Sequence, residues 1–204
     1  MEVRVIPEHF AKAVIDLSHE EKPLICLFSL LANYFEQKNR VAVTYSRDVL
    51  LKNVFLKGLE FRAHERNVEA GNVERSVFKS LLAMAEVLTE NTLRSVVNGF
   101  VDWAEQGLKP SASNGERSRL ITLYSFANSF YDSFNTLALP YFGRLVEMSA
   151  KILNACNATI LSDSSLLLIN GKKGTIEELE ADMLIVHVIG FISNCARHRE
   201  FFTQ

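Results

Sequence analysis

Several features that would point to an enzyme or a secreted protein are scarce in this sequence of 204 residues. Its three cysteines, Cys26, Cys156 and Cys195, are odd in number, lie far apart and form no Cys-x-x-Cys pair. A disulfide framework is therefore not expected, and a reducing compartment fits better. Prolines number only four, so few positions interrupt helical structure.

Long apolar segments are also missing. The N-terminal residues lack the apolar core of a secretory signal. The longest apolar run, 183–192, is interrupted by His187 and is roughly half of the ~20 residues that a membrane-spanning helix needs. We therefore expect a soluble intracellular protein without membrane contact.

The chain carries no strong excess of charge of either sign. With 22 basic and 24 acidic residues its formal net charge is -2, which argues against a domain whose main task is to grip phosphate backbones. Hydrophobic residues make up 48% and charged residues 23%, so the chain is not disordered as a whole. Its length suffices for one domain or a short repeat array with a core.

Sequence motifs of catalysis and nucleotide binding are absent too. There is no G-x-x-x-x-G-K-S/T loop, no G-x-G-x-x-G, no G-x-S-x-G elbow and no H-E-x-x-H pair. Cys195 and His198 lie one helical turn apart, but a zinc site needs three or four ligands, and His187 sits in an apolar run typical of a core histidine. The remaining histidines are scattered, at His9, His19 and His64.

Carboxylates gather only at the start of the last predicted helix, where negative charge favours the helix dipole. These residues are Glu177, Glu178, Glu180 and Asp182. The sequence thus predicts no catalytic residue, no cofactor and no metal site.

Apolar residues at spacings of three and four are abundant and predict about eight helices joined mostly by short loops. The clearest stripe is Leu120, Leu123, Tyr124, Ala127, Phe130, Tyr131, Phe134 and Ala138. A second runs through Leu93, Val96, Val97, Phe100, Val101 and Ala104, in a helix expected to end near Gly107.

Three segments are less regular. Residues 40–45 alternate weakly and could be extended, and Pro140 is expected to start a new helix. Residues 157–175 are predicted to form a polar loop or insert.

Helix pairs spaced about forty residues apart favour an all-α fold, an α-α superhelix or HEAT-like helical-repeat solenoid. Residues 1–204 would form a single helical-repeat segment, with a helical bundle as the alternative. No strict internal sequence repeat accompanies the pattern.

A platform on which nucleic-acid bases stack is rich in aromatic side chains. This chain shares that composition at Trp103 and in the Tyr/Phe stripe from 124 to 142, but in composition only. Their helical spacing indicates core residues, with Trp103 filling the seam between neighbouring helices. Tyr141 is expected to keep an exposed hydroxyl. Lys109, Arg117 and Arg119 form a modest basic group beside the loop at 110–115; a solvated surface is the favoured interpretation, and contact with RNA or a partner is the alternative.

Seven segments occur in an order that resembles a known family. They are Phe55–Arg62, Val73-Glu74, Leu88–Arg94, Val101–Ala104, Arg119–Tyr124, Pro140–Phe142 and Cys195–His198. Together they are similar to the C-terminal domain of the large HEAT-repeat proteins of the small-subunit processome, the U3 small nucleolar ribonucleoprotein, over about residues 50–200. The motif residues carried over are Glu74, Arg94, Asp102, Trp103, Arg119, Tyr124, Pro140, Tyr141 and Phe142. Near Leu93–Ser95 the chain lacks the family's proline.

The resemblance implies a non-catalytic scaffold in the nucleolus of the nucleus. It would support processing of the small-subunit rRNA precursor, ribosome biogenesis and rDNA transcription. Implied partners are other processome proteins and, directly or indirectly, the small nucleolar ribonucleoprotein and pre-rRNA; no small-molecule substrate is implied.

The resemblance also implies that the chain is a fragment of a longer array, and a fragment with open apolar faces is expected to self-associate. Two other classes stay open. One is a generic HEAT or armadillo adaptor, and the other is an all-helical enzyme whose site gathers His187, Cys195 and carboxylates.

Overall fold

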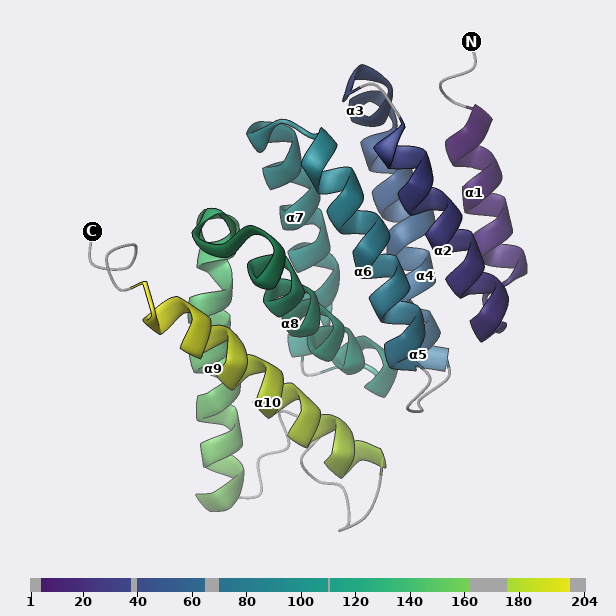
Figure 1. Ribbon diagram of the computed structural model, residues 1–204. Helices are drawn as coiled ribbons and strands as arrows, with labels where there is room; N and C mark the ends of the chain where they lie inside the picture. Colours follow the sequence, from purple (N-terminus) through teal and green to yellow (C-terminus); the bar gives the residue numbers. More distant parts are fainter. Residues whose placement is uncertain (1–4, 38–39, 65–69, 110, 162–175, 199–204) are drawn as a thin grey trace. The chain divides into compact units, whose positions relative to one another are not determined.

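The computed structural model describes residues 5–37, 40–64, 70–109, 111–161 and 176–198, which are helical with short turns and contain no strand (Figure 1). The chain divides into two compact units, Met1–Trp103 and Ala104–Gln204, and the boundary falls inside one helix, α7 (Glu90–Glu105). Each unit is described by itself.

The first unit is built around a packed pair of helices, α2 (Glu21–Glu36) and α6 (Ala70–Val87) (Figure 1). Both bury one stripe of apolar residues at helical spacing, which is how an amphipathic helix joins a core. From α2 the buried side chains are Leu24, Phe28, Leu31, Ala32 and Phe35. From α6 they include Val73, Val77, Phe78, Leu81 and Met84.

A run of consecutive helical segments completes this unit. Helix α1 (Val5–Asp16) is followed, after α2, by α3 (Arg40–Val49), the π-helical η1 (Leu50–Phe55), α4 (Leu56–Leu59) and α5 (Phe61–His64). Gly58 allows α4 to approach α2 closely, since a Cβ at this position would lie 2.3 Å from Cζ of Phe28. The ring of Phe55 stacks on Phe28 and on Phe35, with 6.2 Å between centroids in each pair.

The expectation of an extended segment at residues 40–45 is wrong. These residues are the first turns of α3, where Val43 and Ser46 point inward at helical spacing and Leu50 continues the stripe. Six residues with a weak alternation carry too little information to outweigh the packing of an amphipathic helix.

In the second unit α8 (Asn114–Phe134) is the central helix. It begins with a capping box, in which the Ser113 hydroxyl accepts from the Glu116 amide at 3.2 Å and the Glu116 carboxylate accepts from the Ser113 amide at 2.8 Å. Its predicted stripe is buried from Leu120 to Tyr131, and the helix ends at Asn135, which has a positive φ of 50°. The short η2 (Gln106–Leu108) ends the preceding helix near Gly107, as predicted.

The chain after α8 differs from the sequence-based expectation at two points. Pro140 does not start a helix; it lies inside the 3-10 segment η3 (Asn135–Tyr141), and α9 (Gly143–Leu161) begins three residues later. Helix α9 also continues to Leu161, so residues 157–161 of the predicted polar loop are helical. Residues 162–175 lie outside the described part of the chain.

The last helix, α10 (Ile176–Ala196), packs against α8. Its window Leu179–Ala196 has a mean hydropathy of 1.4 and is long and apolar enough to cross a membrane by length and composition. This window is longer than the apolar run 183–192 expected from the sequence. The difference arises because the few polar residues in the window lower its mean hydropathy only slightly. One third of the window, 33%, is buried in the structure, and core helices of soluble proteins reach the same length and composition.

Candidate interaction site

A buried ion pair joins two of the motif segments in the first unit. Nε and Nη2 of Arg62, on α5, donate to the two carboxylate oxygens of Glu74, on α6, at 2.6 and 2.5 Å. The side chains are only 7% and 5% exposed. A fork-to-fork pair of this kind fixes the orientation of α6 relative to α5, because both hydrogen bonds need one relative orientation. Glu74 thus links α6 to α5.

Trp103 is half-buried at the end of the first unit. Its indole Nε1 donates to Oε1 of Glu60 at 3.0 Å, and its ring lies 5.5 Å from the ring of Phe100. The indole therefore ties α7 to the turn between α4 and α5. Two other motif residues of α7 face outward: Asp102 is exposed, and the partly exposed Arg94 donates to Glu90 one turn earlier at 3.1 Å.

Tyr124 lies in the core of the second unit and carries a fully buried hydroxyl. The hydroxyl donates to the Leu145 carbonyl at 3.2 Å and shares a 2.9 Å hydrogen bond with the Ser149 hydroxyl, which links α8 to α9. Burial raises the pKa of Tyr124 far above its usual value. It also raises the pKa of the Cys195 thiol to about 11. Both groups stay neutral at physiological pH and act as packing residues.

The segment after α8 contributes one core aromatic residue and two residues nearer the surface. Phe142 is buried and its ring lies 5.4 Å from Phe130 and 6.4 Å from Phe191 of α10. Tyr141 is half-buried with its ring 5.8 Å from Phe130, and Pro140 is exposed. The three neighbours in sequence therefore have different environments.

The predicted basic group surrounds an acidic residue. Lys109 is exposed, and Arg117 and Arg119 are half-buried near the start of α8. Hydrogen bonds from Ser113 lower the pKa of Glu116, with smaller contributions from the charges of Arg119 and Lys109. The carboxylate of Glu116 thus offsets part of this positive charge, and contact of the group with RNA or a partner stays a prediction.

Polar contacts between α8 and α10 were not predicted from the sequence. Asn128 donates through Nδ2 to the His187 carbonyl at 3.0 Å and accepts at Oδ1 from Nδ2 of Asn194 at 3.2 Å. Just after α10, Nε2 of His198 lies 2.7 Å from the Tyr131 hydroxyl. His198, which the sequence places one helical turn from Cys195, is thus engaged with a tyrosine. Within the described residues no three His, Cys, Asp or Glu side chains come together.

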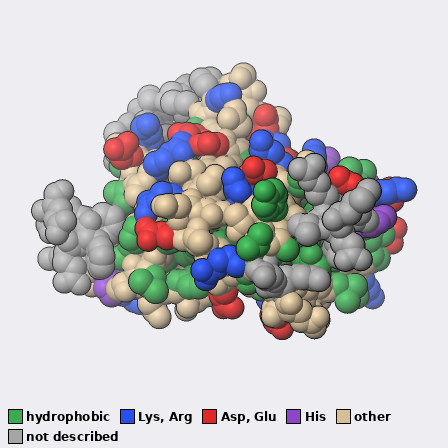
Figure 2. Space-filling model, turned by 90° about the horizontal axis from the view of Figure 1, so that it is seen from above, with side chains coloured by type: hydrophobic (Ala, Val, Ile, Leu, Met, Phe, Trp, Pro, Cys, Tyr) green, Lys and Arg blue, Asp and Glu red, His purple; other side chains and the backbone are tan. Residues whose placement is uncertain are grey.

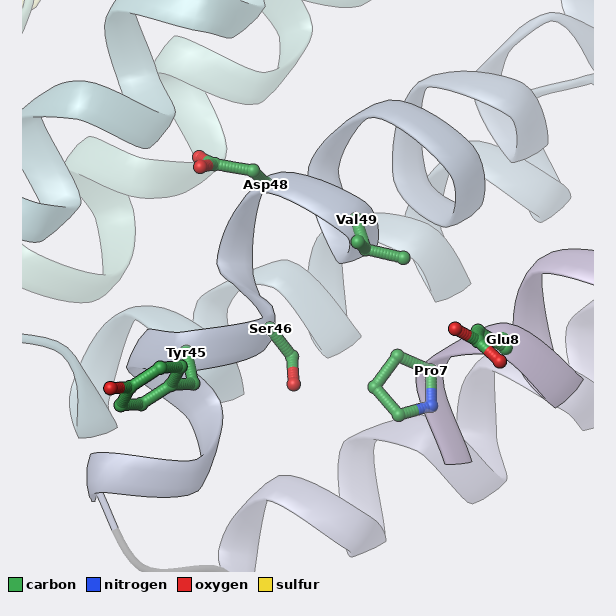
Figure 3. A pocket seen from close by; sticks show the side chains of 6 residues that line it. All are labelled: Pro7, Glu8, Tyr45, Ser46, Asp48 and Val49. Carbon is green, nitrogen blue, oxygen red and sulfur yellow. The ribbon is translucent and has the colours of Figure 1, made fainter. Parts of the chain in front are cut away.

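A cavity of about 280 Å³ lies between α1 and α3 in the first unit. Its lining consists of Pro7, Glu8, Tyr45, Ser46, Asp48 and Val49. Figure 3 shows Ser46 and Val49 on the side nearer Pro7, while Tyr45 and Asp48 point away from it. The polar groups of this lining are the carboxylates of Glu8 and Asp48 and the hydroxyls of Tyr45 and Ser46.

The described surface mixes charges. On the face seen in Figure 2, acidic and basic side chains are interspersed with hydrophobic ones rather than gathered by sign. Successive helices that pack on their neighbours in the chain define the fold class of a helical-repeat protein.

Comparison with known proteins is consistent with this class. The chain belongs to the BP28CT (NUC211) domain family, which matches residues 45–202. It is similar to the HEAT repeat-containing protein 1 homolog of Caenorhabditis elegans, with 44% identity over an alignment of 216 positions. The alignment covers 100% of this chain and 13% of that protein. No solved structure matched the chain.

Two further relatives match over a smaller part of the chain. HEAT repeat-containing protein 1 of Homo sapiens is 32% identical over 50% of the chain and 5% of its own length. The U3 small nucleolar RNA-associated protein 10 of Chaetomium globosum is 22% identical over 65% of the chain and 8% of its own length. The chain therefore spans a small part of each relative. The resemblance inferred from the sequence is confirmed, as is the all-helical, HEAT-like repeat fold.

Proposed function

We propose that this chain is a non-catalytic scaffold segment of a HEAT-repeat protein that supports ribosome biogenesis in the nucleolus. The observation that carries the proposal is the family match over 45–202, together with relatives named as U3 small nucleolar RNA-associated proteins. Its task would be to hold other processome proteins around the small-subunit rRNA precursor. Contact with the small nucleolar ribonucleoprotein and the precursor RNA would be direct or through these proteins.

The internal contacts support a structural role for the motif residues. Arg62–Glu74, Trp103–Glu60 and Tyr124–Ser149 each connect two helical segments inside one unit. Residues that form such links fix the positions of the helices relative to one another. A scaffold depends on these positions, because its partners bind an extended surface rather than a pocket.

The proposal is tested by tagging the protein in its own cells at its natural level. We expect nucleolar fluorescence and co-purification of U3 RNA with small-subunit precursor RNA. A diffuse cytoplasmic signal, or purification with transport or signalling proteins and no U3 RNA, would refute the proposal and favour a generic helical-repeat adaptor.

Direct RNA contact is tested separately on the basic group. Replacing Lys109 and Arg119 by glutamate, with Lys12→Glu on the first unit as a control of equal charge per substitution, should weaken binding of precursor RNA in a gel-shift assay and reduce its salt dependence. Equal binding by all variants would place the RNA contact outside the basic group, and no binding by the native chain would mean that RNA is reached through partner proteins.

A further inference from the structure

The dipeptide Asn-Gly occurs three times in this chain, beginning at Asn98, Asn114 and Asn170. In such a pair the backbone nitrogen of the glycine can attack the side-chain amide of the asparagine, because glycine has no Cβ to obstruct the approach. The attack needs a backbone conformation at the asparagine that a regular helix does not provide. Local structure therefore decides which pair reacts. The pair at Asn170 lies outside the described residues.

The pair at Asn114 lies at the very start of a helix. Asn114 and Gly115 are the first two residues of α8, directly after the capping residue Ser113, and Asn114 is exposed. The first backbone hydrogen bond of this helix is donated by Arg117, to the Ser113 carbonyl at 3.0 Å, so the amide of Gly115 precedes the helical ladder. Fraying of the first turn is therefore enough to change the conformation at Asn114, and the rest of α8 stays closed.

The pair at Asn98 has the opposite environment. It lies in the interior of α7, where each backbone amide donates to the carbonyl four residues earlier. A Cβ at Gly99 would lie 2.7 Å from Cδ2 of Leu51, so the backbone packs closely at this point. The flanking side chains of Val97 and Phe100 are buried. Reaction at Asn98 thus requires α7 to open in its middle, together with part of the core.

We propose that Asn114 is a site of spontaneous deamidation, which places a negative charge in the first turn of α8. The backbone nitrogen of Gly115 forms a bond to Cγ of Asn114, the bond between Cγ and Nδ2 breaks, and Nδ2 leaves as ammonia with the proton of the Gly115 amide. Water then opens the succinimide ring. Addition of water at Cγ gives aspartate, and addition at the main-chain carbonyl carbon gives isoaspartate. Water is the only co-reactant, and nothing is oxidised or reduced.

The two products have different effects on the capping box of α8. Aspartate keeps the main chain unchanged and places a carboxylate where the helix dipole favours it. Isoaspartate lengthens the main chain by one atom between Ser113 and Glu116, the two residues that hydrogen-bond each other at 3.2 and 2.8 Å. The isoaspartate form should therefore lose the capping box and loosen the first turn.

Either product also changes the charge of the basic group. The charges of Arg119 and Lys109 already act on the carboxylate of Glu116 in this turn. A second carboxylate in the same turn would offset more of the positive charge and oppose contact with phosphate. This consequence rests on the proposed RNA contact, whereas the deamidation itself does not, so a failed gel-shift experiment leaves the deamidation standing.

The experiment is incubation of the native chain over days at neutral and mildly alkaline pH, followed by mass spectrometry. Digestion after glutamate places Asn98 in residues 91–105 and Asn114 in residues 106–116, so the change of each amide to a carboxyl group is followed separately. We expect Asn114 to react at least about tenfold faster than Asn98, because the end of a helix opens at far lower free-energy cost than its interior.

The matched control is the same chain unfolded in urea, in which both pairs are open and should react at similar rates. In the folded chain Ser113→Ala should speed the reaction at Asn114 several-fold, because loss of the cap weakens the first turn, and should leave Asn98 unchanged. Gly115→Ala should slow it, because the added Cβ obstructs the attack. Circular dichroism checks that both variants keep their helix content.

Equal rates at Asn98 and Asn114 in the folded chain would overturn the proposal. So would an Asn114 that stays intact in the folded chain while it reacts in urea, since the first turn of α8 would then protect it fully.

Discussion

The buried Arg62–Glu74 pair offers a sharp test of how the first unit is held together. Glu74→Gln keeps the shape of the side chain but removes the negative charge that accepts both hydrogen bonds from Arg62, in a site where the two side chains are 7% and 5% exposed. Breaking a buried ion pair from one side typically costs about 3–5 kcal/mol, because an uncompensated charge stays buried. We expect a loss of stability in this range.

The double variant Arg62→Met, Glu74→Leu separates that cost from the net contribution of the pair. Replacing both partners by apolar residues removes the desolvation penalty with the attraction, so most of the stability should return, to within about 1–2 kcal/mol of the native chain. A conservative control is Glu90→Gln, which breaks the exposed pair with Arg94 and should cost less than about 0.5 kcal/mol.

Urea unfolding followed by tryptophan fluorescence is the suitable assay, because the single tryptophan, Trp103, belongs to the first unit and bonds to Glu60 within it. The reasoning would be refuted if Glu74→Gln cost less than about 1 kcal/mol, or if the double variant were as unstable as the single one. The first result would mean that the two side chains are hydrated in solution, and the second that apolar side chains cannot replace the pair in this site.

Two further predictions concern packing and thiol chemistry. Gly58→Ala should lower the stability by about 1–3 kcal/mol in thermal unfolding, since the added Cβ meets the ring of Phe28. The control Gly71→Ala, with open space around the added Cβ, should be neutral or stabilising. Equal effects of the two substitutions would contradict the close approach of α4 to α2. The buried Cys195, whose pKa is raised to about 11, should resist iodoacetamide at pH 8 while the exposed Cys26 reacts, as followed by mass spectrometry. Between pH 9 and 11 an unfolded chain releases the Cys195 proton while the folded chain holds it, so this thiol should make the stability of the fold decrease as the pH rises. Labelling of Cys195 as fast as that of Cys26 would show that α10 opens.

The sequence predicted the helices that have a long one-sided stripe. In α8 the predicted stripe from Leu120 to Tyr131 is buried, and Ile121, Thr122 and Phe126 outside the stripe are buried as well, so this central helix is covered on more than one side. The prediction failed over residues 40–45, which are helical instead of extended, and at Pro140, which lies inside a 3-10 segment. In both short segments packing, rather than local pattern, decides the structure.

The polar contacts could not be predicted in the same way. Arg62 and Glu74 were identified only as members of a resembling motif, since nothing in their spacing of twelve residues shows that α5 and α6 place them face to face. Asn128 gave no signal at all. Its role depends on the carbonyl of His187, a backbone atom that any residue would supply.

The contacts of Asn128 have a consequence for how α10 docks. Large apolar side chains lie on both the buried and the exposed side of α10. Hydrophobicity alone would therefore allow α10 to rotate by half a turn about its axis, or to shift along it by one helical turn, and still bury apolar side chains against α8. The carbonyl of His187 could be replaced by that of another residue, but the hydrogen bond from the Asn194 side chain forms only in the observed orientation and register. Asn128 thus selects one rotation of α10 about its axis. It thereby determines which apolar face of α10 is buried against α8 and which is exposed to solvent.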